Sequence, residues 1–249
     1  MRKFLVKEPQ IVSMVQAYTP ERVEELMALS LEDGAEAFGM QFCRMRAEYR
    51  TPETYKRLFA KAGDVPTYVT NYRMGENEGK SDELLADELV ELAECGATLC
   101  DVMGDMFDKQ DDEMARDPAA IERQIELIGR IHAAGAQVLM SSHIFKFTPA
   151  ERVLQIALEQ QRRGADICKM VVGAENMADQ IENMRIVTLL KEKLDIPFLF
   201  LSSGETRILR RMGGELGCCM YLCVHEHDEL ATPVQPLLKN VRAIRDNMR

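Results

Sequence analysis

The chain has 249 residues, of which 46% are hydrophobic and 29% are charged. This composition is too apolar for a disordered segment and has none of the strict repeats of a fibrous protein. The 31 basic and 41 acidic residues give a net charge of −10, so the overall field repels nucleic acids and anionic membrane surfaces. We therefore expect a globular protein, one domain over residues 1–249, whose partners are neither nucleic acids nor membranes.

The cysteine pattern indicates a reducing compartment. Seven cysteines, an odd number, lie mostly within apolar stretches, as free buried thiols do in reducing compartments. Lys7 and Glu8 interrupt the apolar N-terminal segment, and no run of 18 apolar residues without a charge occurs in the sequence. We expect a cytoplasmic protein with neither a signal peptide nor a transmembrane span.

Eight short apolar stretches alternate with longer amphipathic ones. The predicted strands are 10–15, 36–42, 66–71, 98–103, 137–142, 167–172, 197–202 and 220–224. Most of the spans between them fit one helix and two loops, which is typical of repeated βα units. Eight such units in about 250 residues predict an α/β fold, the closed (β/α)8 TIM barrel.

The intervening stretches carry helix start and stop signals. Thr-Pro pairs at 19–20, 51–52 and 148–149 predict helices with threonine as N-cap and proline in the first turn. Gly34, Gly63 and Gly164 stand just before strands, where a left-handed residue ends a helix. The helix boundaries therefore agree with the strand assignment.

An open, doubly wound sheet would give the same alternation of strands and helices. Such a sheet that binds dinucleotides carries a glycine-rich fingerprint after its first strand, but this chain has Gln-Ala-Tyr-Thr at 16–19. The closed barrel is therefore favoured. In a barrel of this kind the catalytic residues come from the carboxyl ends of the strands and the loops that follow.

Lys169 lies inside the apolar strand 167–172. Alternation along a strand places it on the same face as Ile167 and Val171, which in a barrel can be the interior. A desolvated lysine has a lowered pKa, and its neutral amine can form a Schiff base with a carbonyl compound. The alternative is a lysine that extends to solvent or pairs with a carboxylate.

His143 ends the strand that precedes the lysine strand. Neighbouring parallel strands lie about 5 Å apart, so this imidazole is expected near Lys169. An imidazole there can move protons to and from imine intermediates. A lone histidine at a strand end is more often a structural residue, but its neighbour Lys169 favours the catalytic interpretation.

Two further features are weaker. Arg73 and Arg211 are candidates for binding a substrate carboxylate, although each alone is more typical of a surface arginine. His225, His227 and Asp228 lie in the run His-Glu-His-Asp-Glu at 225–229 and offer ligands for a divalent metal. A metal-dependent barrel enzyme is the alternative hypothesis for this chain, although a short acidic run is usually a solvated loop.

Two strand segments resemble those of a known family. The segments Val-Leu-Met-Ser-Ser-His-Ile-Phe-Lys-Phe-Thr-Pro (138–149) and Ala-Asp-Ile-Cys-Lys-Met-Val (165–171) resemble the histidine and lysine strands of the type I 3-dehydroquinate dehydratases, and the similarity continues in order over most of the chain. The resemblance implies a (β/α)8 barrel and a lyase of the shikimate pathway. Lys169 would form an imine with 3-dehydroquinate, and His143 would be the general base and acid in the elimination of water that yields 3-dehydroshikimate.

The resemblance also implies the surroundings of the substrate. Arg73 falls where the family has an arginine after its third strand, Arg211 looks like the arginine of an S-R-x-x-G-E stretch, and Gln235 looks like the last residue of the substrate-covering loop. Gln41 stands at the end of the second strand and joins these residues as an expected substrate contact. The family needs no organic cofactor, and its members are often dimers, so a homodimer is expected.

Several positions depart from the family pattern. Gly39 and Gln41 replace a Glu-x-Arg pair, Met103 stands for an acidic residue of the fourth strand, and Ala231 replaces the serine of the covering loop. Buried groups that lose their partners cost about 1 to 3 kcal/mol each, so these changes bear on the substrate. The hypotheses are therefore a lyase acting on 3-dehydroquinate or on a related cyclic keto acid, or an inactive binding paralogue.

Overall fold

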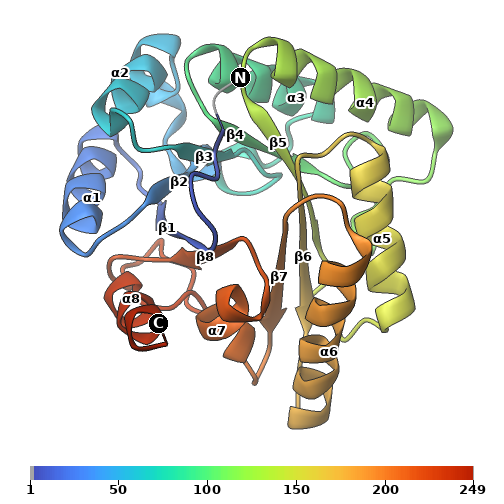
Figure 1. Cartoon of the computed structure of the whole chain (residues 1–249). Helices are drawn as coiled ribbons and strands as arrows, with labels where there is room; N and C mark the ends of the chain where they lie inside the picture. The colour runs from blue at the N-terminus through green and yellow to red at the C-terminus, as the bar shows by residue number, and fades with distance from the viewer. Residues whose placement is uncertain (1–2, 249) are drawn as a thin grey trace.

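The computed structural model describes residues 3–248, which form a barrel of eight parallel strands surrounded by eight α-helices (Figure 1). The strands are β1 (Gln10–Val15), β2 (Ala37–Gln41), β3 (Thr67–Thr70), β4 (Leu99–Met103), β5 (Gln137–His143), β6 (Ile167–Gly173), β7 (Phe198–Ser203) and β8 (Met220–Cys223). The helices are α1 (Pro20–Glu32), α2 (Pro52–Ala62), α3 (Asp82–Glu94), α4 (Pro118–Ala133), α5 (Ala150–Arg162), α6 (Met177–Lys193), α7 (Ile208–Leu216) and α8 (Leu238–Asn247). The eight predicted strands are confirmed, and their ends differ from the prediction by at most one residue.

The strands are arranged in a ring. Strands β1 to β7 lie side by side in chain order, and β8 pairs with β1. At the amino ends of β7 and β8 the backbone N–H of Cys219 donates to the carbonyl of Phe198 at 2.9 Å, which brings the two edges together. The predicted barrel is confirmed over the open sheet. All carboxyl ends of the strands therefore meet at one end of the barrel.

Two of the three predicted threonine caps are confirmed. Thr19 and Thr51 each accept a hydrogen bond from a backbone N–H in the first turn of α1 and α2. The third prediction is wrong, because α5 begins at Ala150 and Pro149 takes the N-cap position. The hydroxyl of Thr148 instead donates to the carbonyl of Lys146 at 3.1 Å, so it stabilises the preceding loop. The three glycines predicted to end helices have positive φ.

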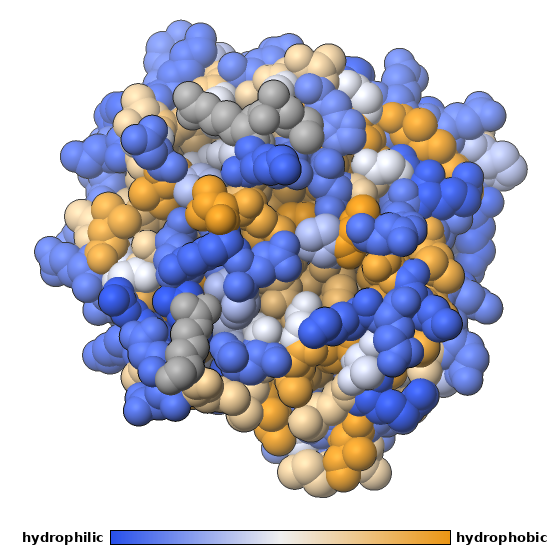
Figure 2. All heavy atoms as spheres, viewed as in Figure 1, coloured by the Kyte–Doolittle hydropathy of each residue, from blue (hydrophilic) through white to orange (hydrophobic). Residues whose placement is uncertain are grey.

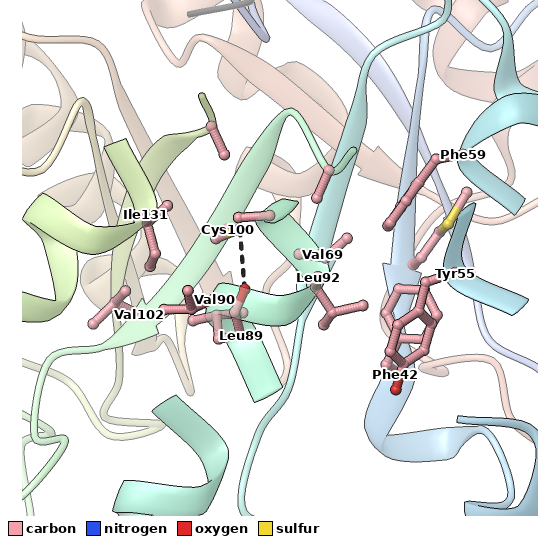
Figure 3. Close-up of a cluster of buried hydrophobic side chains, with 14 of the residues drawn as sticks. Phe42, Tyr55, Phe59, Val69, Leu89, Val90, Leu92, Cys100, Val102 and Ile131 are labelled. Atoms are coloured by element: carbon pink, nitrogen blue, oxygen red, sulfur yellow. Dashed lines mark hydrogen bonds between the residues drawn. The ribbon is translucent and has the colours of Figure 1, made fainter. Parts of the chain in front are cut away.

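The outer core fills the space between the strands and the helices. Figure 3 shows part of it, where Val69 and Val102 of the sheet face apolar residues of α3 and α4. Cys100 points into the same cluster, with its thiol 3.9 Å from the carbonyl of Leu89 (Figure 3). All seven cysteines are free and all but Cys95 are buried, so their predicted packing role is confirmed.

The N-terminal segment crosses the end of the barrel where the strands begin (Figure 1). Phe4 is fully buried, and its backbone N–H donates to Oε1 of Gln137 at 2.6 Å. Its ring lies 6.3 Å from the ring of Tyr68, in an edge-to-face arrangement inside the barrel. Figure 2 views the molecule from the same side and shows mostly hydrophilic residues, with apolar ones between them. Phe4 thus closes the floor of the barrel, which leaves the opposite end for a site.

No helix within residues 3–248 is long and apolar enough to cross a bilayer.

A buried arginine fastens the loop between β4 and α4. Arg163 is 3% exposed, and its guanidinium donates to the carbonyls of Gly104 (3.2 Å) and Ala115 (2.7 Å) near the two ends of this loop. It also donates to Oε1 of Gln124 on α4 at 2.5 Å and to Oε1 of Glu159 on α5 at 2.9 Å. One side chain therefore fixes a long irregular segment against two helices.

We predict that Arg163→Leu lowers the free energy of unfolding by about 3 to 5 kcal/mol, because several buried acceptors lose their donor at about 1 to 3 kcal/mol each. Denaturant unfolding measures the change. The neighbouring Arg162→Leu is the matched control, since Arg162 is exposed and its ion pair with Glu159 contributes about 0.5 kcal/mol. Equal losses in both variants would contradict this role of Arg163.

Candidate active site

A buried ion pair occupies the barrel interior. Lys169 of β6 is 4% exposed, and its Nζ lies 3.1 Å from Oδ2 of Asp101 on β4. The interior orientation of Lys169 agrees with the alternation of its strand. The sequence left two interpretations of Lys169 open, a reactive lysine inside the barrel and a lysine that pairs with a carboxylate. Lys169 is inside the barrel and also pairs with a carboxylate. A lysine in the barrel is held there by a charge of opposite sign.

Asp101 collects hydrogen bonds from four side chains. Oδ1 accepts from the hydroxyl of Ser141 at 2.5 Å, and Oδ2 accepts from Lys169 and from the hydroxyls of Tyr68 and Tyr72. Burial alone favours the neutral acid, but the positive charge of Lys169 and these hydrogen bonds hold the pKa of Asp101 below its ordinary value. Asp101 is therefore ionised at neutral pH and pairs with an ammonium group.

Two phenols complete the surroundings of the lysine. The Nζ of Lys169 lies 3.0 Å from the hydroxyl oxygen of Tyr68 and 2.8 Å from that of Tyr72. Burial and the charge of Asp101 raise the pKa of both phenols well above 10, so both stay protonated. The three N–H donors of the ammonium group thus have three oxygen acceptors, two phenols and one carboxylate.

His143 stands at the end of β5 and is held by Glu113. Its Nδ1 lies 2.9 Å from Oε2 of Glu113, and its backbone N–H donates to the same oxygen at 2.6 Å. Because a carboxylate only accepts, Nδ1 carries the proton and Nε2 is left as the basic nitrogen. The ring stacks on Phe145 (5.9 Å between centroids) and meets the ring of Tyr72 edge to face at 5.3 Å.

Three residues of this site lie outside the sequence prediction. Tyrosine is common in buried strands, so Tyr68 and Tyr72 gave no signal of a site, and only the tertiary structure shows that their hydroxyls reach Lys169. Glu113 lies in the irregular loop after β4 with a φ of 46°, in the left-handed region that non-glycine residues seldom adopt. Such conformations cluster at functional sites, but nothing in the sequence marks this one.

Arg73 is engaged by two carboxylates. Its guanidinium donates to both oxygens of Asp82 at 2.7 Å and to Oδ1 and the carbonyl of Asp105 at 2.7 and 3.1 Å. These contacts join the start of α3 to the loop after β4. The structure thus places Arg73 at the carboxyl end of the barrel but pairs it within the protein.

The two adjacent arginines of α7 differ in burial. Arg211, the predicted carboxylate ligand, is exposed, and its Nη1 donates to the carbonyl of Arg207 at 3.3 Å. Arg210 is 6% exposed and donates through Nε to the carbonyl of Ser202 at the end of β7 (2.8 Å). Within residues 3–248 Arg210 forms no ion pair, and burial together with the charges of its arginine neighbours lowers its pKa to about 10. Arg210 is therefore a buried cation that lacks an anion.

Two buried carboxamides also lack partners. The Oε1 atoms of Gln235, in the loop after β8, and of Gln16, directly after β1, accept no hydrogen bond in the described part of the chain. Gln16 approaches this loop through Thr232, whose hydroxyl accepts from Nε2 at 3.4 Å. Gln41 is half-buried at the end of β2, and its side chain has no hydrogen bond to the residues described. Each of the three side chains therefore has hydrogen-bonding capacity that the described residues do not use.

The geometry of the loop after β8 does not favour the metal alternative. Nδ1 of His225 pairs with Asp33 at 2.8 Å, and Nε2 of His227 lies 2.8 Å from the carbonyl of Gln235. Asp228 accepts backbone N–H groups of its own loop. Residues 3–248 contain no group of three or more histidine, cysteine, aspartate or glutamate side chains that would hold a metal ion. His225, His227 and Asp228 are neighbours in the sequence, but they do not point to a common centre, because each binds a different partner in the protein.

The positions that depart from the family pattern are filled rather than vacant. A Cβ atom on Gly39 would lie 2.2 Å from Sδ of Met14 and 3.3 Å from the ring of Tyr68. Met103 is buried, and Ala231 is partly buried against an apolar cluster that includes residues of β6 and β7. The space for a side chain at position 39 is thus occupied by Met14 and Tyr68.

We predict that Asp101→Asn lowers the free energy of unfolding at pH 7 by about 3 to 5 kcal/mol, because Lys169 loses its buried counter-charge. Lys169→Met should cost less, since three hydroxyls still donate to Asp101. The pKa of Asp101 is lowered, so its stabilisation is present above the ordinary pKa of 3.8 and is lost as the pH falls below it. Denaturant unfolding tests the order, and a larger loss for Lys169→Met would contradict it.

Comparison with known proteins points to one family. The sequence profile described as type I 3-dehydroquinase matches residues 38–248. A 3-dehydroquinate dehydratase from Geobacillus thermodenitrificans is 28% identical over 165 residues, which are 66% of this chain and 60% of that protein. One from Alkaliphilus oremlandii is 33% identical over 112 residues, 44% of this chain and 43% of that protein. The matched segments thus span less than two thirds of the length of these curated relatives.

Solved structures show the same fold. The 3-dehydroquinate dehydratase of Geobacillus kaustophilus superposes with a TM-score of 0.81 at 18% identity and covers 97% of this chain and 91% of its own. The type I enzyme of Clostridium difficile superposes with a TM-score of 0.82 at 17% identity, covering 98% of this chain and 94% of its own. At such identities the likeness establishes the barrel.

Proposed function

Since the chain belongs to the type I 3-dehydroquinase family, we propose that it is a lyase that dehydrates 3-dehydroquinate to 3-dehydroshikimate through an imine on Lys169. The observation that carries the proposal is a buried lysine inside the barrel, beside a histidine whose Nε2 is free of partners within residues 3–248. A lysine amine and an imidazole base are the two groups that an imine-assisted elimination requires.

The reaction begins at the lysine. Lys169 transfers a proton to its carboxylate partner and attacks the ketone carbon of the substrate, and loss of water gives a protonated imine. The imine withdraws electrons from the neighbouring carbon and acidifies its hydrogen. Because Asp101 lies 3.1 Å from Nζ, it is positioned both to accept the proton and to stabilise the positive imine nitrogen.

His143 then carries out the elimination. Nε2 removes the proton next to the imine carbon, and the resulting imidazolium protonates the departing hydroxyl group. Glu113 holds the imidazole in the tautomer with the proton on Nδ1 and stabilises the imidazolium through the 2.9 Å contact. Hydrolysis of the imine releases the product and restores Lys169.

The substrate carboxylate and hydroxyl groups need polar partners. We assign the carboxylate to Arg210 in place of Arg211, because Arg210 is the buried guanidinium without a counter-ion at the end of β7. The free Oε1 atoms of Gln235 and Gln16 are suited to accept hydrogen bonds from hydroxyl groups. Gln41, at the end of β2, remains a proposed substrate contact. Arg73 positions the loop after β4.

We also propose that the protein acts in the cytoplasm as a homodimer. The free cysteines are consistent with a reducing compartment, and dimers are what the family resemblance implies.

The imine mechanism predicts that Lys169→Ala abolishes turnover of 3-dehydroquinate. Borohydride reduction of the wild type mixed with 3-dehydroquinate should leave a stable adduct on Lys169, detected by peptide mass spectrometry. His143→Ala should still form the adduct but slow product formation by about 10² to 10⁴-fold, because only the proton transfers are impaired. A Lys169→Ala variant with a rate near that of the wild type would rule out the mechanism.

The assignment of the carboxylate predicts different effects for the two arginines. Arg210→Ala should lower kcat/KM by about 10 to 150-fold, the equivalent of about 1.5 to 3 kcal/mol for a hydrogen bond to a charged group. Arg211→Ala is the matched control and should change kcat/KM less than about threefold. Arg210→Ala should change the free energy of unfolding by only about 1 kcal/mol, because the lost hydrogen bond to the carbonyl of Ser202 is offset by removal of an unpaired buried charge. The reverse order of the two kcat/KM values would return the role to Arg211.

A further inference from the structure

The lysine amine is surrounded by groups that the imine mechanism above leaves unused. Tyr68 and Tyr72 approach Nζ of Lys169 at 3.0 and 2.8 Å, and both also donate to Asp101. Imine formation moves several protons at this nitrogen and at the ketone oxygen that becomes water. The two protonated phenols beside Nζ are therefore candidates for these proton transfers.

The two phenols differ in their access to a substrate. Tyr68 lies within β3, is fully buried, and rests on Phe4 at the floor of the barrel. Tyr72 lies in the loop after β3 and is only partly buried. A substrate enters from the carboxyl ends of the strands, so it meets Tyr72 before Tyr68.

Tyr72 also lies between the two catalytic residues. Its hydroxyl contacts Lys169, and the edge of its ring meets the imidazole of His143 at 5.3 Å. His143 itself makes no hydrogen bond to Lys169 in the part of the chain that the structure describes. The hydroxyl of Tyr72 is therefore an acid beside Nζ of Lys169 that can act in imine formation without His143.

Building on the proposed function, we propose that the Tyr72 hydroxyl is the catalytic acid of imine formation and imine hydrolysis, and that it donates its proton to the ketone oxygen as Lys169 attacks. Tyr68 positions it, with the two hydroxyl oxygens 3.5 Å apart and both bound to Asp101.

The protons balance in four transfers. The ammonium of Lys169 gives one proton to Asp101, and the amine lone pair forms the N–C bond while the C=O π pair moves to oxygen. That oxygen takes the proton of Tyr72, and the phenolate regains a proton from the new N–H group, which gives a neutral carbinolamine. Asp101 then returns its proton to the carbinolamine hydroxyl, and the nitrogen lone pair expels water to form the protonated imine. One ammonium and one ketone have become one protonated imine and one water.

The loss of a charged side chain at position 39 is consistent with this role. The space above Gly39 holds the side chain of Met14 and the ring of Tyr68, so one of the two phenols lies where a longer side chain at position 39 would reach. The hydrogen-bond donors beside Lys169 inside the barrel are thus the hydroxyl groups of the two tyrosines.

Rapid-quench reduction separates imine formation from elimination. Wild type and Tyr72→Phe are mixed with 3-dehydroquinate, quenched with borohydride at increasing times, and the Lys169 adduct is measured by mass spectrometry. Tyr72→Phe should form the adduct about 10² to 10⁴-fold more slowly, the range for loss of a general acid. Adduct formation at the wild-type rate overturns the proposal, whatever happens to later steps.

Two other phenols serve as comparisons. Tyr221 lies on β8, and its hydroxyl donates to Oε1 of Glu215 at 3.2 Å. Tyr221→Phe removes this hydroxyl and should leave the rate of adduct formation unchanged. Tyr68→Phe removes the supporting phenol and should slow adduct formation less than Tyr72→Phe does. An equal or larger effect of Tyr68→Phe overturns the assignment to Tyr72.

A second measurement applies if Tyr72→Phe is unfolded. A fluorinated tyrosine at position 72 keeps the ring and the hydroxyl but makes the phenol more acidic. The rate of adduct formation should rise with this acidity, because a general acid follows Brønsted behaviour. An unchanged or lower rate overturns the proposal.

A simple ketone separates this proposal from the function on which it rests. If the wild type forms no adduct with 3-dehydroquinate but forms one on Lys169 with 4-oxocyclohexanecarboxylate, the proposed function fails. The ratio of the wild-type and Tyr72→Phe rates with that ketone then decides the role of Tyr72. If neither ketone gives an adduct, both proposals are overturned.

Discussion

The burial of Lys169 together with Asp101 is the constraint on which the rest of the site depends. A single charge inside a barrel is too costly to keep, and a pair is tolerated only when the remaining donors and acceptors are satisfied. Here Ser141, Tyr68 and Tyr72 complete the hydrogen bonds of the carboxylate, and the ammonium group has three acceptors. Phe4 closes the floor below, so the pair is reached only from the carboxyl ends of the strands.

The proposed catalytic groups are supported by two arginines that hold the loop after β4. Arg163 fastens the segment that contains Glu113, and Arg73 joins the same segment to α3. Glu113 is then held in a left-handed conformation, with its carboxylate on the imidazole of His143. A base must be held within a fraction of an ångström to act, and this explains why so many buried charges serve one loop.

The departures from the family pattern leave the buried pair of Lys169 and Asp101 in place. Gly39 leaves room for Met14 and Tyr68, and the polar groups next to the lysine become phenols. Arg210, one position before the residue that resembles the family's arginine, is a buried guanidinium without an ion pair among the residues described. A barrel tolerates such exchanges because each strand end contributes to the site independently of the others.

The barrel and the two central catalytic candidates could be predicted from the sequence. Strand period, helix caps and glycine stops are local signals, and they placed all eight strands to within one residue and Lys169 and His143 at neighbouring strands. Which side chains meet could not be predicted, because it depends on contacts between elements far apart in the sequence. The barrel brings Asp101 and Tyr68 from their strands, and Tyr72 from the loop after β3, to the lysine. A turn of about 100° per helical residue buries Arg210 while exposing Arg211. Tertiary contacts also separate the histidines of the loop after β8, because His225 pairs with Asp33 at the end of α1 whereas His227 turns back to the carbonyl of Gln235 in its own loop.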